Sequence, residues 1–189
     1  TLKGTLDLSG CKRLEECYLD GTGITQPKFA VGGGLKTVEF GAYTNYVIFK
    51  NMPMLTNSGV NINACKKNVT DFGVSDCLNM QPISMLYDIY SSQKKNMRLK
   101  RIRCVGMNEH IPDGAIDMLY EMSLGDFNGM DSEGVGTSGI PVFEGKLTVN
   151  NAPQRTLDLI AEAYPQLEIE CYNIVRPSGY KINFTSPTS

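Results

Sequence analysis

The stretch LDLSGCKRLEECYLDGTGI, from Leu6 to Ile24, contains one short apolar pattern twice. The first copy reads LxLxxCxxL from Leu6 to Leu14, and the second reads LxxCxLxxTxI from Leu14 to Ile24. Apolar residues one position apart point to the same side of an extended strand, and the intervening Gly and Asp favour bends. A strand and turn of this length cannot bury its own apolar face, so it has to stack on a neighbouring unit. The stretch therefore predicts the first coils of a leucine-rich-repeat-like solenoid.

The same pattern returns downstream at intervals of one repeat. Cys17, Val38 and Val60 follow one another at intervals of 21 and 22 residues, and about 20–29 residues per repeat is usual in leucine-rich arrays. The apolar run YVIF at 46–49 is expected on the opposite side of the coil. The phrase FxVxxCxxM at 72–80 closely repeats the opening one. Residues 1 to about 80 are therefore predicted to form β-rich coils.

From Pro82 onward, apolar residues with helical spacing alternate with strand-like segments. Helices are predicted at 82–96, from Asp113 to 122 with Asp113 as the N-cap, and at 155–164. Strands are predicted at 99–105, 142–149 and 165–171. The predicted fold class is α/β: a leucine-rich-repeat-like solenoid with a parallel sheet, β-rich N-terminal coils and strand-helix C-terminal coils.

The predicted solenoid covers residues 1–175. Residues 176–189 are rich in Pro, Ser, Thr and Gly, which predicts a linker or the start of a following domain. Residue 1 is Thr rather than Met, so we expect the chain to begin inside a longer polypeptide.

The six cysteines are expected to be free thiols. Most of them lie in or beside a strand-turn phrase, where a solenoid uses small buried residues: Cys11, Cys17, Cys65, Cys77 and Cys104. Their number is even, but the chain has neither CxxC nor the dense spacing of small disulfide-stapled domains. One or more disulfides is the alternative. A Cys/His zinc site is hard to assemble in a chain with a single His.

The composition argues against a nucleic-acid partner and a membrane span. The formal net charge is −2, whereas nucleic-acid-binding domains usually carry a basic surplus. Lys and Arg cluster once, in KKNMRLKRIR at 94–103. A solvated helix end leading into a strand is the favoured interpretation, and an anion-binding or nucleic-acid patch is the alternative. No run approaches the ~20 apolar residues of a transmembrane helix.

The loop at 125–139, GDFNGMDSEGVGTSG, is long enough to be functional or mobile. It contains four oxygen donors that a calcium ion could use: Asp126, Asn128, Asp131 and Glu133. Met130 occupies the third ligand position of the helix-loop-helix calcium pattern, so an exposed flexible loop is the favoured interpretation and calcium is a weak candidate.

Other candidate sites have weaker support. The segment GGGLKT at 32–37 lacks the Gly that precedes Lys in a phosphate-binding loop, so a turn is favoured. His110 lacks the flanking sequence of a cysteine protease and is interpreted as a turn residue. Six tyrosines could stack on sugars, but their spacing favours the core for most of them: Tyr43, Tyr46, Tyr87, Tyr90, Tyr120 and Tyr164. No catalytic residue and no cofactor is predicted.

Two parts of the chain resemble irregular leucine-rich segments in very large proteins of gut bacteria and their tailed bacteriophages. One is the opening LDLSGCKRLEECYLDGTGIT. The other is the closing part, in which GIPVFEGKLTV at 139–149 is followed by a short helix and YPQLEI at 164–169. This closing part looks like the Gx(V/L)x(V/I), helix, FPxLxI ending of such segments, with Tyr164 where Phe is commoner. The resemblance covers residues 1–175 at the level of pattern.

The resemblance implies a non-enzymatic structural and binding module of a bacteriophage tail or tail-fibre protein. Its expected partners are other virion proteins or a host-surface receptor, and its expected location is the virion. The first alternative is an extracellular leucine-rich adhesin of a bacterial cell surface that binds a protein or glycan. The second, from another class, is an enzyme with its site in the loop at 125–139. The resemblance carries over no catalytic residue.

Overall fold

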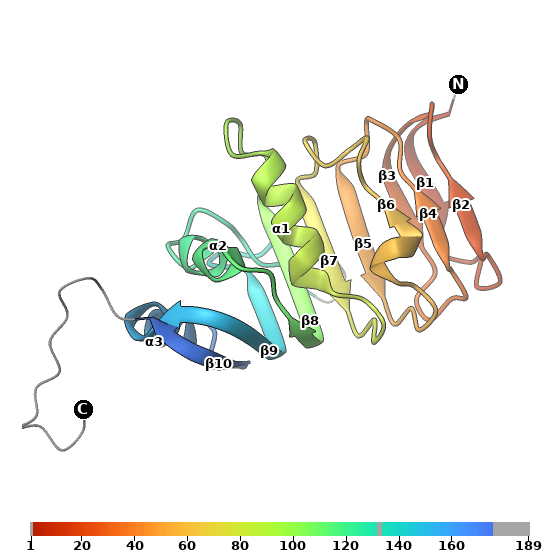
Figure 1. Ribbon diagram of the computed structural model, residues 1–189. Helices are drawn as coiled ribbons and strands as arrows, with labels where there is room; N and C mark the ends of the chain where they lie inside the picture. Colours follow the sequence, from red (N-terminus) through yellow and green to blue (C-terminus); the bar gives the residue numbers. More distant parts are fainter. Residues whose placement is uncertain (1, 132–133, 176–189) are drawn as a thin grey trace, which may run out of the picture.

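The computed structural model describes residues 2–131 and 134–175, which form an α/β structure with parallel sheets (Figure 1). The first half contains strands and one 3-10 turn: β1 (Lys3–Leu8), β2 (Glu16–Tyr18), β3 (Gly23–Phe29), β4 (Thr37–Glu39), β5 (Tyr46–Lys50), η1 (Asn57–Gly59), β6 (Val60–Asn61) and β7 (Asp71–Ser75). The second half alternates helices with longer strands: α1 (Pro82–Ser92), β8 (Arg101–His110), α2 (Ala115–Met122), β9 (Val142–Pro153), α3 (Gln154–Ala163) and β10 (Leu167–Val175). The predicted α/β class and parallel pairing are confirmed.

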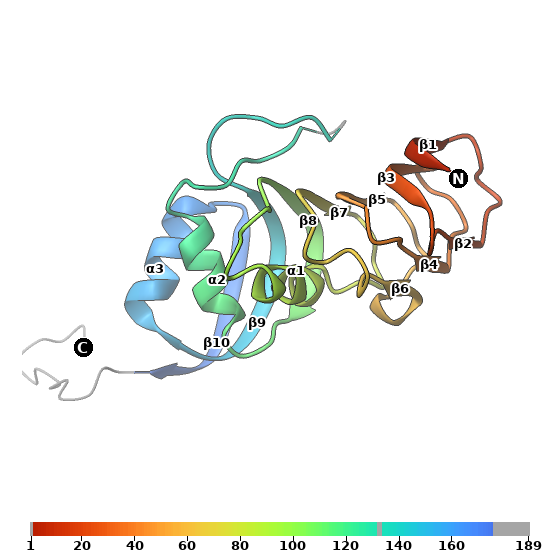
Figure 2. The same ribbon diagram turned by 90° about the horizontal axis from the view of Figure 1, so that it is seen from above.

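The chain passes back and forth between two sides of the molecule. One side carries a two-stranded sheet, β1-β3, and a five-stranded sheet in the order β5-β7-β8-β9-β10, while the three-stranded sheet β2-β4-β6 lies on the other. Seen from above, the three α-helices lie on the same side of the large sheet as β2-β4-β6 (Figure 2). Helices thus replace strands on this side after β6, as the switch to helical spacing at Pro82 predicts.

The strand registers explain the spacing in the sequence. In the three-stranded sheet, Cys17 pairs with Val38 and Val38 with Val60, and all three side chains are buried. The five-stranded sheet aligns apolar residues in the same way, since Phe72 of β7 pairs with Val47 of β5 and with Ile102 of β8. Each apolar side chain therefore stacks on its counterpart in the next strand, which gives a continuous core between the two sides.

Three phenylalanines fill the core of the strand-only half. Phe29 stacks on Phe49 with ring centroids 5.5 Å apart, and Phe40 contacts both rings at 6.1–6.2 Å. Phe29 ends β3, Phe49 lies in β5 and Phe40 follows β4, so the cluster joins the two sides. Such aromatic contacts stabilise a core beyond the area that they bury.

The predicted cap of the second helix is wrong. Helix α2 begins at Ala115 with Gly114 as its N-cap residue, and no side chain caps it. Gly114 has φ +89°, a left-handed conformation that glycine adopts easily, and it separates Asp113 from the helix. The Asp113 carboxylate instead accepts a hydrogen bond from the Asn150 side chain at 3.3 Å. Helix α1 begins at Pro82 as predicted but ends at Ser92, four residues earlier than predicted.

All six thiols are free, as the sequence favours, but one of them lies outside the core. Cys11, predicted to be a small buried residue, is exposed, because it sits in the turn after β1 where its N–H donates to the carbonyl of Leu8. Cys171 is half-buried. The other four are buried: Cys17, Cys65, Cys77 and Cys104.

Thiol labelling of the native chain should separate the exposed, the half-buried and the buried cysteines. Burial raises the pKa of each of the four buried thiols, that of Cys65 to about 12, so they hold little of the reactive thiolate at neutral pH. We expect an aromatic disulfide reagent to modify Cys11 rapidly and Cys171 more slowly, and the other four only after unfolding. Cys11→Ser should remove the rapid phase. Rapid modification of a third thiol in the folded chain would contradict the assigned burial.

Candidate functional site

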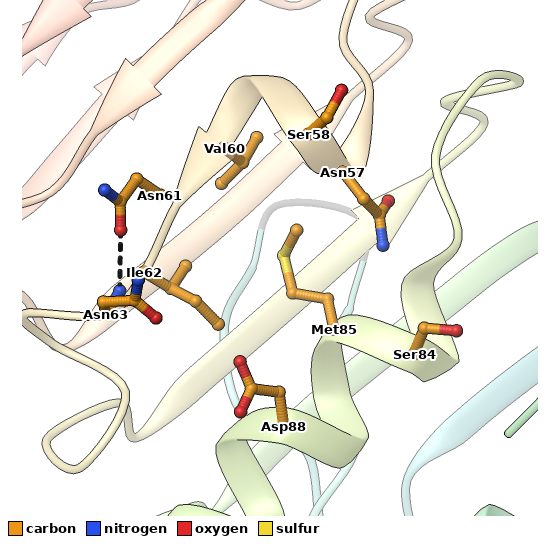
Figure 3. A pocket seen from close by; sticks show the side chains of 9 residues that line it. All are labelled: Asn57, Ser58, Val60, Asn61, Ile62, Asn63, Ser84, Met85 and Asp88. Carbon is orange, nitrogen blue, oxygen red and sulfur yellow. Dashed lines mark hydrogen bonds between the residues drawn. The ribbon is translucent and has the colours of Figure 1, made fainter. Parts of the chain in front are cut away.

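A depression of about 370 Å³ lies between β6 and α1, where the second side of the molecule changes from strands to helices (Figure 3). Nine residues line it: Asn57, Ser58, Val60, Asn61, Ile62, Asn63, Ser84, Met85 and Asp88. Most carry amide, hydroxyl or carboxylate groups. Ligand-binding pockets are usually lined mostly by apolar side chains with a few polar groups, whereas this depression is mostly polar and offers its amide, hydroxyl and carboxylate groups to a hydrogen-bonding partner.

Hydrogen bonds between successive passes of the chain fix the wall of this depression. Thr56 caps η1, with its Oγ1 accepting from the Gly59 N–H at 3.2 Å. The Asn57 side chain then bonds the backbone of Gln81 in both directions, since Nδ2 donates to the Gln81 carbonyl at 2.9 Å and Oδ1 accepts from the Gln81 N–H at 2.7 Å. Asn57 therefore ties η1 to the residue that precedes α1.

The opposite wall is α1, whose N-terminus is capped from a distant strand. Pro82 at the first helical position has no N–H, and Gln81 makes no side-chain cap. The free N–H groups of Ile83 and Ser84 donate instead to the Glu109 carboxylate of β8, both at 2.8 Å, and the Ser84 hydroxyl donates at 2.7 Å. A carboxylate at a helix N-terminus also interacts favourably with the helix dipole. Glu109 is 3% exposed, so this contact is part of the core.

Glu109 should make stability depend on pH. Burial raises its pKa, and the hydrogen bonds from Ser84 and Ile83 lower it by less. Because the folded chain then holds this proton more tightly than the unfolded chain, the stabilisation is fully present below the unfolded pKa of about 4.3 and is lost as pH rises through the folded pKa. Glu109→Gln cannot titrate. We expect the difference in unfolding free energy between the wild type and this variant to fall as pH rises from about 4, measured by urea denaturation.

The matched control for this experiment is Glu168→Gln, which removes a carboxylate from an exposed position of β10. It should leave the pH profile of stability as in the wild type. Parallel profiles for the wild type and Glu109→Gln would contradict the raised pKa of Glu109.

The floor of the depression is apolar and its rim is polar. Figure 3 shows the Met85 and Ile62 side chains facing one another across it, while Asn61 and Asn63 lie on the β6 side. The Asn61 Oδ1 accepts from the Asn63 N–H at 3.0 Å, and Asp88 forms an ion pair with Lys66 at 3.1 Å. The lining has one carboxylate and no His, Cys or Lys. This arrangement suits recognition of a partner through hydrogen bonds better than acid–base chemistry.

The calcium candidates do not all fall within the described structure. Glu133 lies outside the described residues. Asp126 and Asp131 are exposed, and the Asp131 Oδ1 accepts from the Val135 N–H at 2.9 Å. The Asn128 backbone donates to the Lys100 carbonyl and accepts from the Ile102 N–H. Across residues 2–131 and 134–175, no three His, Cys, Asp or Glu side chains group as metal ligands would.

The remaining sequence candidates are dispersed. His110 ends β8, stacks on Tyr172 at 5.9 Å and lies 2.9 Å from the Thr148 Oγ1 through its Nδ1. The glycines at 32–34 lie in the connection between β3 and β4, where Val31 and Gly32 form a turn. Of the six tyrosines considered for sugar stacking, Tyr90 and Tyr164 are buried, as predicted, while Tyr43 is 68% exposed. The other three are half-buried: Tyr46, Tyr87 and Tyr120.

Sequence reasoning missed the depression beside α1 and the Glu109 cap. A local signal for the depression exists in NSGVNIN at 57–63, where three asparagines and a serine surround two apolar residues. No local signal marks Glu109, because its partners on α1 lie 25–26 residues earlier in the chain.

Comparison with known proteins finds no matching family model, no matching curated protein and no matching solved structure. Within the described ranges, none of the helices is both long and apolar enough to span a membrane.

Proposed function

We propose that residues 1–175 form a leucine-rich-repeat-like solenoid that serves as a non-enzymatic structural and binding module of a bacteriophage tail-type virion protein. The observation that carries the proposal is the parallel register of Cys17, Val38 and Val60, which repeats at the intervals of leucine-rich coils. The resemblance of the opening and closing stretches to leucine-rich segments of tailed-phage proteins supports the virion as the location.

The binding role is supported by the depression beside α1. Solenoids present extended, rigid surfaces to partner proteins or glycans. The wall formed by η1 and β6 is tied to α1 through Asn57, and α1 is held by Glu109, so the hydrogen-bonding groups of the rim are preorganised. We assign this surface to another virion protein or to a receptor on the host.

Immunogold electron microscopy tests the location. Antibodies raised against the 189-residue chain should label the tails of purified phage particles from the source culture. Labelling of the surface of particle-free cells, with none on tails, would replace the proposal with the bacterial adhesin. If neither the phage tails nor the cell surfaces were labelled, both the virion proposal and the adhesin proposal would be overturned. Pre-immune serum and particles of an unrelated tailed phage are the controls.

A further inference from the structure

A second depression, of about 620 Å³, lies at the C-terminal end of α1 and carries a concentrated positive charge. Eight residues line it: Lys67, Asn68, Ser91, Ser92, Lys94, Lys95, Asn96 and Arg98. Four are cations and none is a carboxylate. The whole chain has a formal net charge of −2, so this local surplus is opposite in sign to the molecule that carries it.

The four cations are not neutralised by neighbouring side chains. Within the described structure, the ion pairs are Lys36–Glu15, Lys66–Asp88, Arg101–Asp71 and Lys146–Glu170. None of these pairs includes a cation of the depression, although Lys66, directly before Lys67, is paired. Positive charge that folding leaves uncompensated in a concave surface attracts anions.

The favourable interaction of cations with a helix C-terminus does not account for the whole cluster. It explains Lys94 and Lys95, which follow the end of α1 at Ser92. Lys67 comes from the loop before β7, and Arg98 lies five residues beyond the C-cap residue Gln93. Two separate segments therefore bring cations to the helix end.

One buried side chain holds these segments together. Gln93 is 2% exposed, and its Nε2 donates to the carbonyls of Lys66 and Val69, both at 2.9 Å. Its Oε1 accepts from the N–H groups of Arg98 and Leu99 at 2.8 and 2.9 Å. The backbone beside Lys67 and at Arg98 is thus fixed around a single residue, and the depression is preorganised.

We propose that this depression binds an anionic oligosaccharide, with Lys67, Lys94, Lys95 and Arg98 contacting its sulfate or carboxylate groups. The side chains of Asn68, Ser91 and Asn96 supply amide and hydroxyl groups that suit sugar hydroxyls. This inference goes beyond the proposed function and does not depend on a virion location.

The lining favours a sugar over a nucleic acid or a membrane. Single-stranded nucleic acids stack on exposed aromatic rings, but the lining contains none, and the nearby ring of Tyr90 is only 7% exposed. Duplex DNA is bound through many phosphate contacts along an extended basic surface, which a chain of net charge −2 does not favour. The charges here also lie in a concave surface, whereas a bilayer is flat.

The helix that ends at the basic depression also lines the first depression. Ser84 and Asp88 line the first depression, and Ser91 and Ser92 line the second. These residues follow helical spacing on one face of α1, so both depressions are lined by the same helix face, on which Asp88 of the first depression is paired with Lys66. An oligosaccharide can thus place its acid groups on the cations and further hydroxyl groups toward Asn61 and Asn63.

Binding measurements on the full 189-residue chain test the proposal. The probes are short fragments of dextran sulfate and of polygalacturonate, with neutral dextran, single-stranded DNA, duplex DNA and phosphatidylserine vesicles for comparison. We expect at least one acidic polysaccharide to bind at about 50 mM salt and to weaken on the order of tenfold by about 200 mM, because the contacts are ionic. Neutral dextran should not bind measurably. Comparing dextran sulfate with polygalacturonate shows whether the depression binds sulfate or carboxylate groups of the polysaccharide.

Paired variants locate the site. Lys67→Ala/Lys95→Ala should weaken binding about tenfold or more, since it removes two charge-assisted contacts. Lys36→Ala/Lys146→Ala removes the same charge from exposed positions elsewhere and should bind as the wild type does. Unchanged thermal melting of all three proteins confirms that folding is intact. Equal weakening by both variants, no binding of either acidic polysaccharide, or equal or tighter binding of DNA or vesicles would overturn the proposal.

Discussion

Replacing Phe49 with alanine is expected to lower the free energy of unfolding by about 3–5 kcal/mol, the usual range for a buried aromatic truncation. Phe49 is 1% exposed and contacts the rings of Phe29 and Phe40. These rings come from three successive passes of the chain, so neighbouring side chains cannot fill the space without moving a strand. Urea denaturation followed by circular dichroism measures the loss.

The control is Tyr43→Ala, which truncates an aromatic ring that is 68% exposed and lies close to β5 in the sequence. It should change the free energy of unfolding by no more than about 0.5 kcal/mol. A loss below about 1 kcal/mol in Phe49→Ala would mean that the three rings do not form a packed cluster.

Gln93→Leu is expected to destabilise the chain by about 3–5 kcal/mol, because four backbone groups lose their hydrogen-bond partner while the volume of the side chain is nearly kept. These are the carbonyls of Lys66 and Val69 and the N–H groups of Arg98 and Leu99. Each unsatisfied buried group costs about 1–3 kcal/mol, and partial access of water keeps the total below their sum. Thermal and urea denaturation both report the change.

Gln81→Leu is the matched control, since Gln81 is exposed at the other end of α1 and its side chain makes no cap hydrogen bond. It should be nearly neutral. If Gln93→Leu were equally mild, the carbonyls and N–H groups around it would have to be solvated, and the preorganisation of the basic depression would lose its structural basis.

The sequence predicted the strand spacing because apolar periodicity reports burial directly. Cys17, Val38 and Val60 stand at equivalent positions in parallel strands, so the interval between them equals the length of one pass around the core. The change to helices after β7 was also visible, since Pro82 favours the first position of a helix and the residues after it take helical spacing.

The polar features were not predictable because their partners lie about one pass away in the chain. Glu109 bonds Ile83 from 26 residues away, Gln93 bonds Lys66 from 27, and Asn57 bonds Gln81 from 24. A local pattern can show that a residue is polar, but it cannot show which unpaired backbone group the side chain will meet in the next pass of the chain. Two predictions were wrong for a related reason: that Cys11 is buried and that Asp113 caps α2. Each depends on the conformation of a single turn.

The parallel pairing has a mechanical consequence. The described chain begins at β1 and ends at β10, at opposite ends of the stacked strands (Figure 1). Within the five-stranded sheet, backbone hydrogen bonds join each strand from β5 to β8 to the next one across this direction. A force that pulls the two ends apart would therefore open one strand pair after another, instead of shearing a whole sheet at once. Under tension the chain should lengthen in small steps at modest force, starting from its ends, and the strand pairs that are still closed should keep their shape.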